Sequence, residues 1–176
     1  MESRGCRRGA TGVLTCMSHD GDMTTSIPAG PDPATIVRYI LDTYPDADLV
    51  EAMNAYFFSV DPEKHWPNFA TIVRTNEHDD ASRLDREGAF RLNLGVDRAT
   101  FERVSAADPD PDFTAFDTLL PHPVYGQQHW ISILNPTEVT FQRSVIPLIA
   151  LAHDRVAATH ARHHRSRLHS RADRPG

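Results

Sequence analysis

The sequence contains few cysteines and no long apolar run. Its two cysteines, Cys6 and Cys16, both lie near the N-terminus, outside the segment that carries most apolar residues. A disulfide framework needs cysteines within the folding segment, so this placement excludes one and favours a reducing compartment. The longest apolar run, Val145–Ala152, has eight residues including Pro147, whereas a membrane span needs roughly 18. The sequence therefore predicts a cytoplasmic protein that does not cross a membrane.

Signatures of the common catalytic classes are also missing. There is no G-x-S-x-G turn for a serine nucleophile. There is no glycine-rich phosphate loop either, because Gly88 and Gly95 are seven residues apart and flank an alternating segment, as turn residues do. The carboxylates of residues 77–87 fall in a charged, aperiodic stretch, where nothing is expected to raise the pKa of a carboxyl group. The spacing of His122 and His129 matches no metal-binding signature. We therefore expect no cofactor and no metal.

Basic residues are scarce in the middle of the chain. Residues 31–153 carry nine basic and nineteen acidic side chains, whereas residues 154–176 carry six arginines against Asp154 and Asp173. An acidic surface repels a phosphate backbone, so the middle segment is a poor nucleic-acid binder. Only the basic C-terminal run is suited to attract an anionic partner.

Composition divides the chain into three parts. Residues 1–30 are rich in Gly, Ser, Thr and Arg without periodicity, which predicts a disordered N-terminal extension. Met17 and Met23 precede the predicted domain, so we treat both, beside Met1, as candidate starts of the natural chain. Residues 31–158 predict a single domain, and residues 159–176 predict a disordered basic tail rich in His and Arg.

Periodicity in the middle segment predicts an α+β fold. Asp32 and Pro33 begin a helix over 32–43, because Asp caps a helix and Pro suits its first position. A second helix is predicted over 98–106 and a last helix from about Ser144. The N-terminal, middle and C-terminal helices are expected to cover one face of an antiparallel sheet and leave the other face open. The four to five strands of this sheet are predicted from residues 48–52, 54–60, 69–74, 89–94 and 129–134.

Three blocks of the sequence are similar to those of a known family. They read FATIVRTN, SRLDREGAFRLNLGVDRATFE and DTLLPHPVYGQQHWISILNP, within about residues 33–157. The chain resembles a bacterial domain family of unknown function. That family looks related to the MmcQ/YjbR-like fold, through the order of its elements and the pair His129-Trp130. The resemblance implies an α+β fold likened to a DNA-binding double wing and implies no catalytic residues; a fold does not by itself transfer a function.

Site-like chemistry is densest in the stretch from His122 to Pro136. This stretch joins a proline-bounded loop with polar and aromatic side chains to an alternating strand. An indole and an imidazole at the start of a strand suit a ligand platform, and the polar face of residues 89–94 adds hydrogen-bonding groups. The candidate ligand-binding residues are His65, Trp66, Arg91, Asn93, His122, Tyr125, His129 and Trp130.

Each candidate also has a purely structural interpretation. His129 is able to bond to loop backbone while Trp130 covers the sheet edge, and Arg91 is able to pair with an acidic loop. Tyr125 is able to pack its ring and bond to a carbonyl. The dipeptide His-Trp occurs twice, at 65–66 and 129–130. The two pairs either line one shared pocket or recur by chance.

Three functions remain open from the sequence. The first is a non-enzymatic cytosolic module that binds a small polar or aromatic ligand, or a protein partner, at the open sheet face and the loop 122–130. The second is an enzyme of unrecognised type in which His122 or His129 acts as acid or base. The third is weak nucleic-acid binding through the basic tail, which predicts steep salt dependence.

Overall fold

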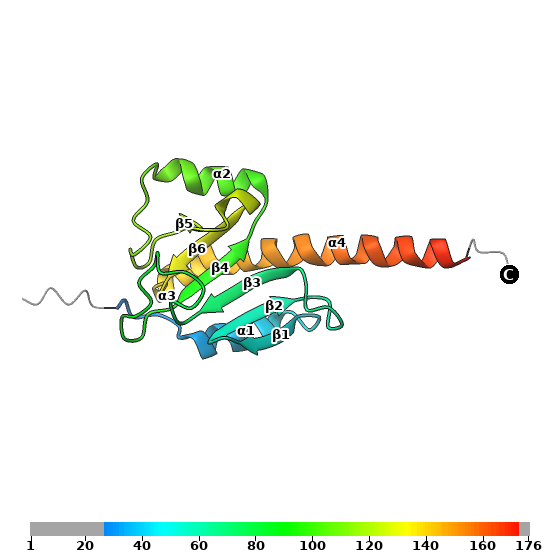
Figure 1. Ribbon diagram of the computed structural model, residues 1–176, viewed down its shortest axis with the longest axis horizontal. Helices are drawn as coiled ribbons and strands as arrows, with labels where there is room; N and C mark the ends of the chain where they lie inside the picture. Colours follow the sequence, from blue (N-terminus) through cyan, green and yellow to red (C-terminus); the bar gives the residue numbers. More distant parts are fainter. Residues whose placement is uncertain (1–26, 173–176) are drawn as a thin grey trace, which may run out of the picture.

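A six-stranded antiparallel sheet organises the protein (Figure 1). The structure, a computed structural model, describes residues 27–172. The strands lie in the order β1-β2-β3-β4-β6-β5, and each neighbouring pair is antiparallel. The predicted α+β class and antiparallel sheet are therefore confirmed. The strands are β1 (Asp48–Ala52), β2 (Ala55–Ser59), β3 (Asn68–Val73), β4 (Arg91–Gly95), β5 (Leu120–Pro121) and β6 (Trp130–Leu134).

The sheet has one strand more than the four to five expected. Leu120 and Pro121 form β5 by pairing with β6 at the edge of the sheet. The sequence predicts Phe113–Leu120 as irregular or as a single helical turn, because a strand of two residues shows no alternation. Pro121 is compatible with this position because proline, which has no N–H for the ladder, is confined to edge strands.

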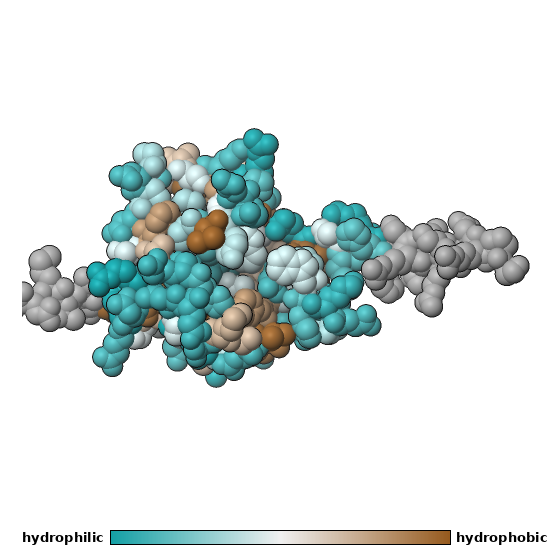
Figure 2. Space-filling model, viewed as in Figure 1, coloured by the Kyte–Doolittle hydropathy of each residue, from teal (hydrophilic) through white to brown (hydrophobic). Residues whose placement is uncertain are grey.

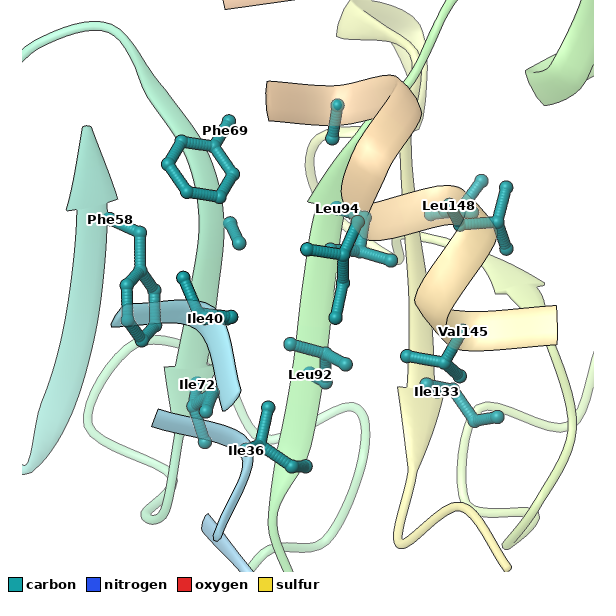
Figure 3. Packing of buried hydrophobic residues seen from close by; sticks show 14 of the residues in the cluster. Ile36, Ile40, Phe58, Phe69, Ile72, Leu92, Leu94, Ile133, Val145 and Leu148 are labelled. Atoms are coloured by element: carbon teal, nitrogen blue, oxygen red, sulfur yellow. The ribbon is translucent and has the colours of Figure 1, made fainter. Parts of the chain in front are cut away.

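One face of the sheet is covered by α1 (Pro33–Thr43) and by the C-terminal helix. Asp32 caps α1 by accepting a hydrogen bond from the Thr35 N–H at 2.7 Å, and Pro33 occupies the first turn, as predicted. Ile36 and Ile40 are fully buried. Figure 3 shows them directed toward β3 and β4. The apolar stripe predicted for this helix therefore forms part of the core.

The alternation predicted for β4 and β6 is also confirmed. Leu92 pairs with Ile133 and Leu94 with Ile131, and all four side chains belong to the core beneath the helices (Figure 3). α2 (Arg98–Ala107) begins at Arg98, as predicted, with Asp97 as its cap. It lies against β5 and β6, where it adds apolar side chains to the margin of this core. Each fully buried aliphatic side chain contributes about 1.5–3 kcal/mol.

The second face of the sheet is covered, although the sequence predicts it to be open. Residues 76–90 form a loop across part of this face. Leu84 and Ala89 of the loop pack with Ala55, Val73 and Leu134 of the strands. The charge of the loop indicates a solvated segment, but Leu84 is enough to anchor it to the sheet. The polar side chains of β4 and β6 on this face are consequently buried.

The C-terminal helix begins earlier than predicted. Thr137, rather than Ser144, caps its first turn by accepting a hydrogen bond from the Thr140 N–H at 3.2 Å. The helix then consists of α3 (Glu138–Thr140), a π-helical turn η2 (Phe141–Val145) and α4 (Ile146–Ala172). The predicted start at Ser144 is therefore wrong, and Ser144 lies inside the helix.

The π-helical turn explains how Pro147 is accommodated so close to the helix start. Ile146 donates its N–H to the carbonyl of Phe141, one residue farther back than in an α-helix. Proline has no N–H to donate and its ring clashes with a regular preceding turn. The wider turn precedes Pro147 directly, so the helix continues through the position at which the sequence suggested a new beginning.

Replacing Thr137 by alanine is expected to lower the free energy of unfolding by about 1–2 kcal/mol, because a hydroxyl cap is lost. Thr137 Oγ1 also donates to Asp117 Oδ2 at 3.0 Å, and that bond is lost as well. The matched variant Ser144→Ala is expected to change stability by less than about 0.5 kcal/mol. Urea denaturation of both variants measures the difference, and equal losses would contradict the assigned helix start.

α4 is anchored to the body in its first half and extends beyond it. The His153 ring stacks on Tyr44 with centroids 4.3 Å apart, and its Nε2 lies 2.8 Å from Asp46 Oδ1. Val156 is the last buried residue among the described side chains of the helix. We expected the chain to leave the helix at residue 159, but α4 continues to Ala172 and points away from the sheet (Figure 1).

Some expectations concern residues that the structure does not describe. The N-terminal extension as far as residue 26 and the alternative starts Met17 and Met23 lie outside the described residues. The division of the chain into an extension, a domain over 31–158 and a tail stays a prediction.

Candidate functional site

Three buried polar side chains form a row across the second face of the sheet. Thr71 on β3 pairs in register with Asn93 on β4, and Asn93 pairs with Ser132 on β6. Asn93 is only 1% exposed, and its Nδ2 donates to Thr71 Oγ1 at 2.9 Å. Its Oδ1 is buried without a hydrogen-bond partner among the described residues. A buried amide oxygen left in this state costs about 1–3 kcal/mol.

Arg91 lies two residues before Asn93 on the same face of β4. Its guanidinium is 1% exposed and forms a bidentate pair with Asp79 of the covering loop, at 2.9 Å from Nη1 and 2.6 Å from Nη2. Nη1 also donates to Ser82 Oγ at 2.7 Å. The Arg91 Nε, however, is buried without a partner in the described part of the chain. Of the interpretations left open for Arg91, the ion pair with the acidic loop is one that the structure shows.

His122 completes this group from the loop after β5. Its backbone N–H donates to the Trp130 carbonyl, and its Nδ1 accepts the N–H groups of Val124 and Tyr125, both at 3.1 Å. Burial and the positive charge of Arg91 together lower the pKa of His122 to about 4, although the charge of Asp79 opposes the shift. His122 is therefore neutral near pH 7.

The bonds of His122 also fix its tautomer. Because Nδ1 accepts two backbone N–H groups, the ring proton lies on Nε2, which is a hydrogen-bond donor. We name the group formed by Thr71, Asp79, Ser82, Arg91, Asn93, His122 and Ser132 the polar cluster. Its members come from β3, β4, β6 and two loops. They combine one neutralised ion pair with further donors and acceptors.

Tyr125 lies at the exposed margin of the polar cluster. Its ring centroid is 5.0 Å from that of His122, and its side chain is 54% exposed, next to the exposed Val124. In Figure 2, hydrophobic side chains lie near the middle and also near the lower edge of the viewed face, among strongly hydrophilic ones. Tyr125 therefore offers an aromatic surface beside the cluster.

His129 and Trp130 do not join the polar cluster. His129 has a left-handed backbone, φ 60°, after the short helix η1 (Gly126–Gln128), and its ring lies 5.5 Å from the ring of Phe101 on α2. The Trp130 ring lies over Gly95, where a Cβ atom would come within 3.3 Å of it. The structural interpretation expected a His129 ring bonded to loop backbone and a Trp130 ring over the sheet edge, whereas the described contacts are Phe101 for His129 and Gly95 of the inner strand β4 for Trp130.

The second His-Trp pair, His65-Trp66, lies between β2 and β3, away from the polar cluster. His65 lies in the loop between β2 and β3, where its Nδ1 is 2.5 Å from Asp48 Oδ2 of β1. Trp66 is 65% exposed. The described contacts of His65 and His129 involve different elements, so the structure does not join the two pairs in one site.

The sequence interpretation missed Thr71, Asp79 and Ser82 as members of this group. Asp79 and Ser82 lie in the charged loop. The acidic excess of this loop was a signal for a partner of Arg91 such as Asp79, whereas Ser82 carried no separate signal. Thr71 carried no separate signal, since a threonine in a β-branched strand is ordinary.

Within residues 27–172, no helix is both long and apolar enough to cross a membrane. Among the described side chains, no three His, Cys, Asp or Glu residues are grouped so that they could hold a metal ion.

The model of a family of unknown function, DUF6194, matches residues 31–166. This match covers more than half of the chain, so the chain belongs to that family. No protein with a curated description matches the chain. No solved structure matches it either.

Proposed function

We propose that this member of the DUF6194 family is a non-enzymatic binding module that holds a small polar ligand at the polar cluster. The observation that supports the proposal is that two of the buried atoms without partners among the described residues, Arg91 Nε and Asn93 Oδ1, lie on one face of β4. Proteins seldom leave buried polar atoms unsatisfied, because each costs about 1–3 kcal/mol. A bound molecule that bonds to both atoms would remove this cost.

The chemistry of the cluster favours binding over acid–base catalysis. His122 has no nitrogen available as a base, because Nδ1 already accepts two N–H groups and Nε2 carries the proton. Its lowered pKa, about 4, also keeps it from acting as an acid near neutrality. The pKa of Asp79 is lowered by its hydrogen bonds to Arg91, so this carboxylate stays ionised and engaged.

Two further proposals rest on the sequence. Kinship with the MmcQ/YjbR-like fold is supported by the order of the elements and by His129-Trp130 at the start of β6. A cytoplasmic location is supported by the scarcity of cysteine. Nucleic-acid binding through the Arg-rich end of α4 stays an alternative, and it predicts affinity that falls steeply with salt.

Thermal melting against a panel of small amides, carboxylates, nucleosides and sugars tests the binding proposal. At about 100 times its Kd, a ligand of the cluster is expected to raise the Tm of the full chain by roughly 5–10 °C. The variant Asn93→Leu, which removes the side-chain amide with its Oδ1 and Nδ2, is expected to show no rise. Arg98→Ala is the matched control, because Arg98 forms an exposed pair with Glu102 on α2. A rise that survives in Asn93→Leu, or no rise with any compound, would contradict the proposal.

A further inference from the structure

We propose that the ligand of the polar cluster is uncharged and presents a carboxamide-like edge, with a carbonyl oxygen beside an N–H group. Primary amides, ureas, lactams and the amide edges of heterocyclic bases share this edge. The inference rests on the proposed binding function and specifies its ligand class. Three features of the cluster support it: its charge balance, the pattern of its unpartnered atoms and the tautomer of His122.

The charge balance of the cluster disfavours an anionic ligand. The positive charge of Arg91 is already neutralised by the bidentate pair with Asp79, which is itself only 12% exposed. A bound carboxylate or phosphate would place a second negative charge beside one guanidinium in a largely buried site. Burying an unpaired charge is costly, so such a ligand would have to displace Asp79 or bind weakly.

The unpartnered atoms require one acceptor and one donor from the ligand. Arg91 Nε–H needs an acceptor, and Asn93 Oδ1 needs a donor. The two residues alternate along β4, so their Cα atoms are roughly 7 Å apart on the same face. An amide group carries a carbonyl oxygen and an N–H on adjacent atoms. It is therefore able to bond to both residues at once.

The orientation of the Asn93 side chain agrees with this pattern. Its Nδ2 donates to Thr71 Oγ1 at 2.9 Å, which leaves Oδ1 as the buried amide atom without a partner among the described residues. His122 adds an Nε2–H donor from the opposite loop, because Nδ1 is held by two backbone N–H groups. A carbonyl oxygen has two lone pairs, and it is thus able to accept from both Arg91 and His122.

The exposed ring of Tyr125, whose centroid is 5.0 Å from the His122 ring, indicates where the rest of the ligand lies. A planar ring attached to the amide would stack on or against this tyrosine at the margin of the cluster. Aromatic amides are therefore the most informative probes, and each has a carboxylate of the same shape.

Titration calorimetry of the full chain with two matched pairs, nicotinamide against nicotinate and benzamide against benzoate, tests the inference. Each amide is expected to bind roughly tenfold more tightly than its carboxylate, because one wrong charge or unmade hydrogen bond costs at least that factor. The variant Asp79→Asn removes the negative charge beside Arg91, and the order of each pair is expected to reverse. Asn93→Leu is expected to abolish amide binding.

The outcomes separate this inference from the binding proposal. Carboxylates that bind the parent chain as tightly as the amides, with binding still lost in Asn93→Leu, overturn the ligand class and leave the binding site standing. Amide binding that persists in Asn93→Leu overturns the inference, because the ligand then lies elsewhere. If none of these four probes binds while a sugar from the larger panel does, the ligand class is wrong and the site is retained. If no compound of any class binds, both proposals fail.

Discussion

Replacing Asp79 by alanine is expected to lower the free energy of unfolding by about 3–5 kcal/mol. The loss arises because Arg91, 1% exposed, is left as a buried charge without its bidentate partner. Desolvation of the guanidinium is then no longer offset by a carboxylate. For a chain of this size, the change corresponds to a fall in Tm of roughly 10 °C. Urea denaturation and thermal melting both measure it.

Two further variants separate the loss of the pair from the loss of packing. The double variant Asp79→Ala/Arg91→Met removes both charges, and it is expected to recover a large part of the stability because no unpaired charge remains. Glu51→Ala removes one partner of the exposed pair with Arg74, and it is expected to cost less than about 1 kcal/mol. A double variant as unstable as Asp79→Ala alone would show that the loop packing, and not the ion pair, carries the effect.

The local signals of the sequence predicted most of the fold, because each depends on residues close together in the chain. The cap at Asp32 with Pro33 determines where α1 begins, whatever packs against it. The alternation of Leu92 and Leu94 with Arg91 and Asn93 determines which side chains of β4 share a face. These features follow from helix and strand periodicity alone.

The local sequence patterns gave wrong predictions where a contact between residues far apart in the chain determines the structure. Ser144 resembles a helix start because Pro147 follows it, and only the π-helical turn shows that the helix passes through. Residues 76–90 appear solvated by composition, but Leu84 is buried against Val73 and Leu134, and Arg91 binds Asp79. Neither contact can be predicted from the order of polar and apolar residues within the loop itself.

The candidate site shows the same division. Arg91 and Asn93 were placed on one face by alternation, and His122 joins them because the β5–β6 pairing brings its loop to that face. His129 and Trp130 were singled out as a dipeptide, but neighbours at a strand start point in different directions. His129 consequently reaches Phe101 on α2, while Trp130 covers Gly95.

Lowering the pH from about 6.5 to about 4 is expected to remove up to about 3 kcal/mol of stability through His122. The ordinary pKa of the unfolded histidine is 6.5, whereas burial and the Arg91 charge lower that of the folded form to about 4. Between these values the unfolded chain binds a proton that the folded chain does not bind. The contribution is therefore complete above pH 6.5 and is lost progressively as the pH falls toward 4.

The variant His122→Asn isolates this contribution. Asparagine has an acceptor oxygen in place of Nδ1 and is able to keep the bonds to the Val124 and Tyr125 N–H groups, but it does not titrate. Urea denaturation at several pH values is expected to show a shallower pH dependence for the variant between pH 6.5 and 4. The contribution of Asp79 to the free energy of unfolding is lost in a separate, more acidic range. Its hydrogen bonds to Arg91 lower its pKa in the folded chain, so its stabilising charge is kept until the pH falls below about 4. Parallel curves for parent and variant would show that the pKa of His122 is not lowered in the folded chain, which would contradict the burial of its ring.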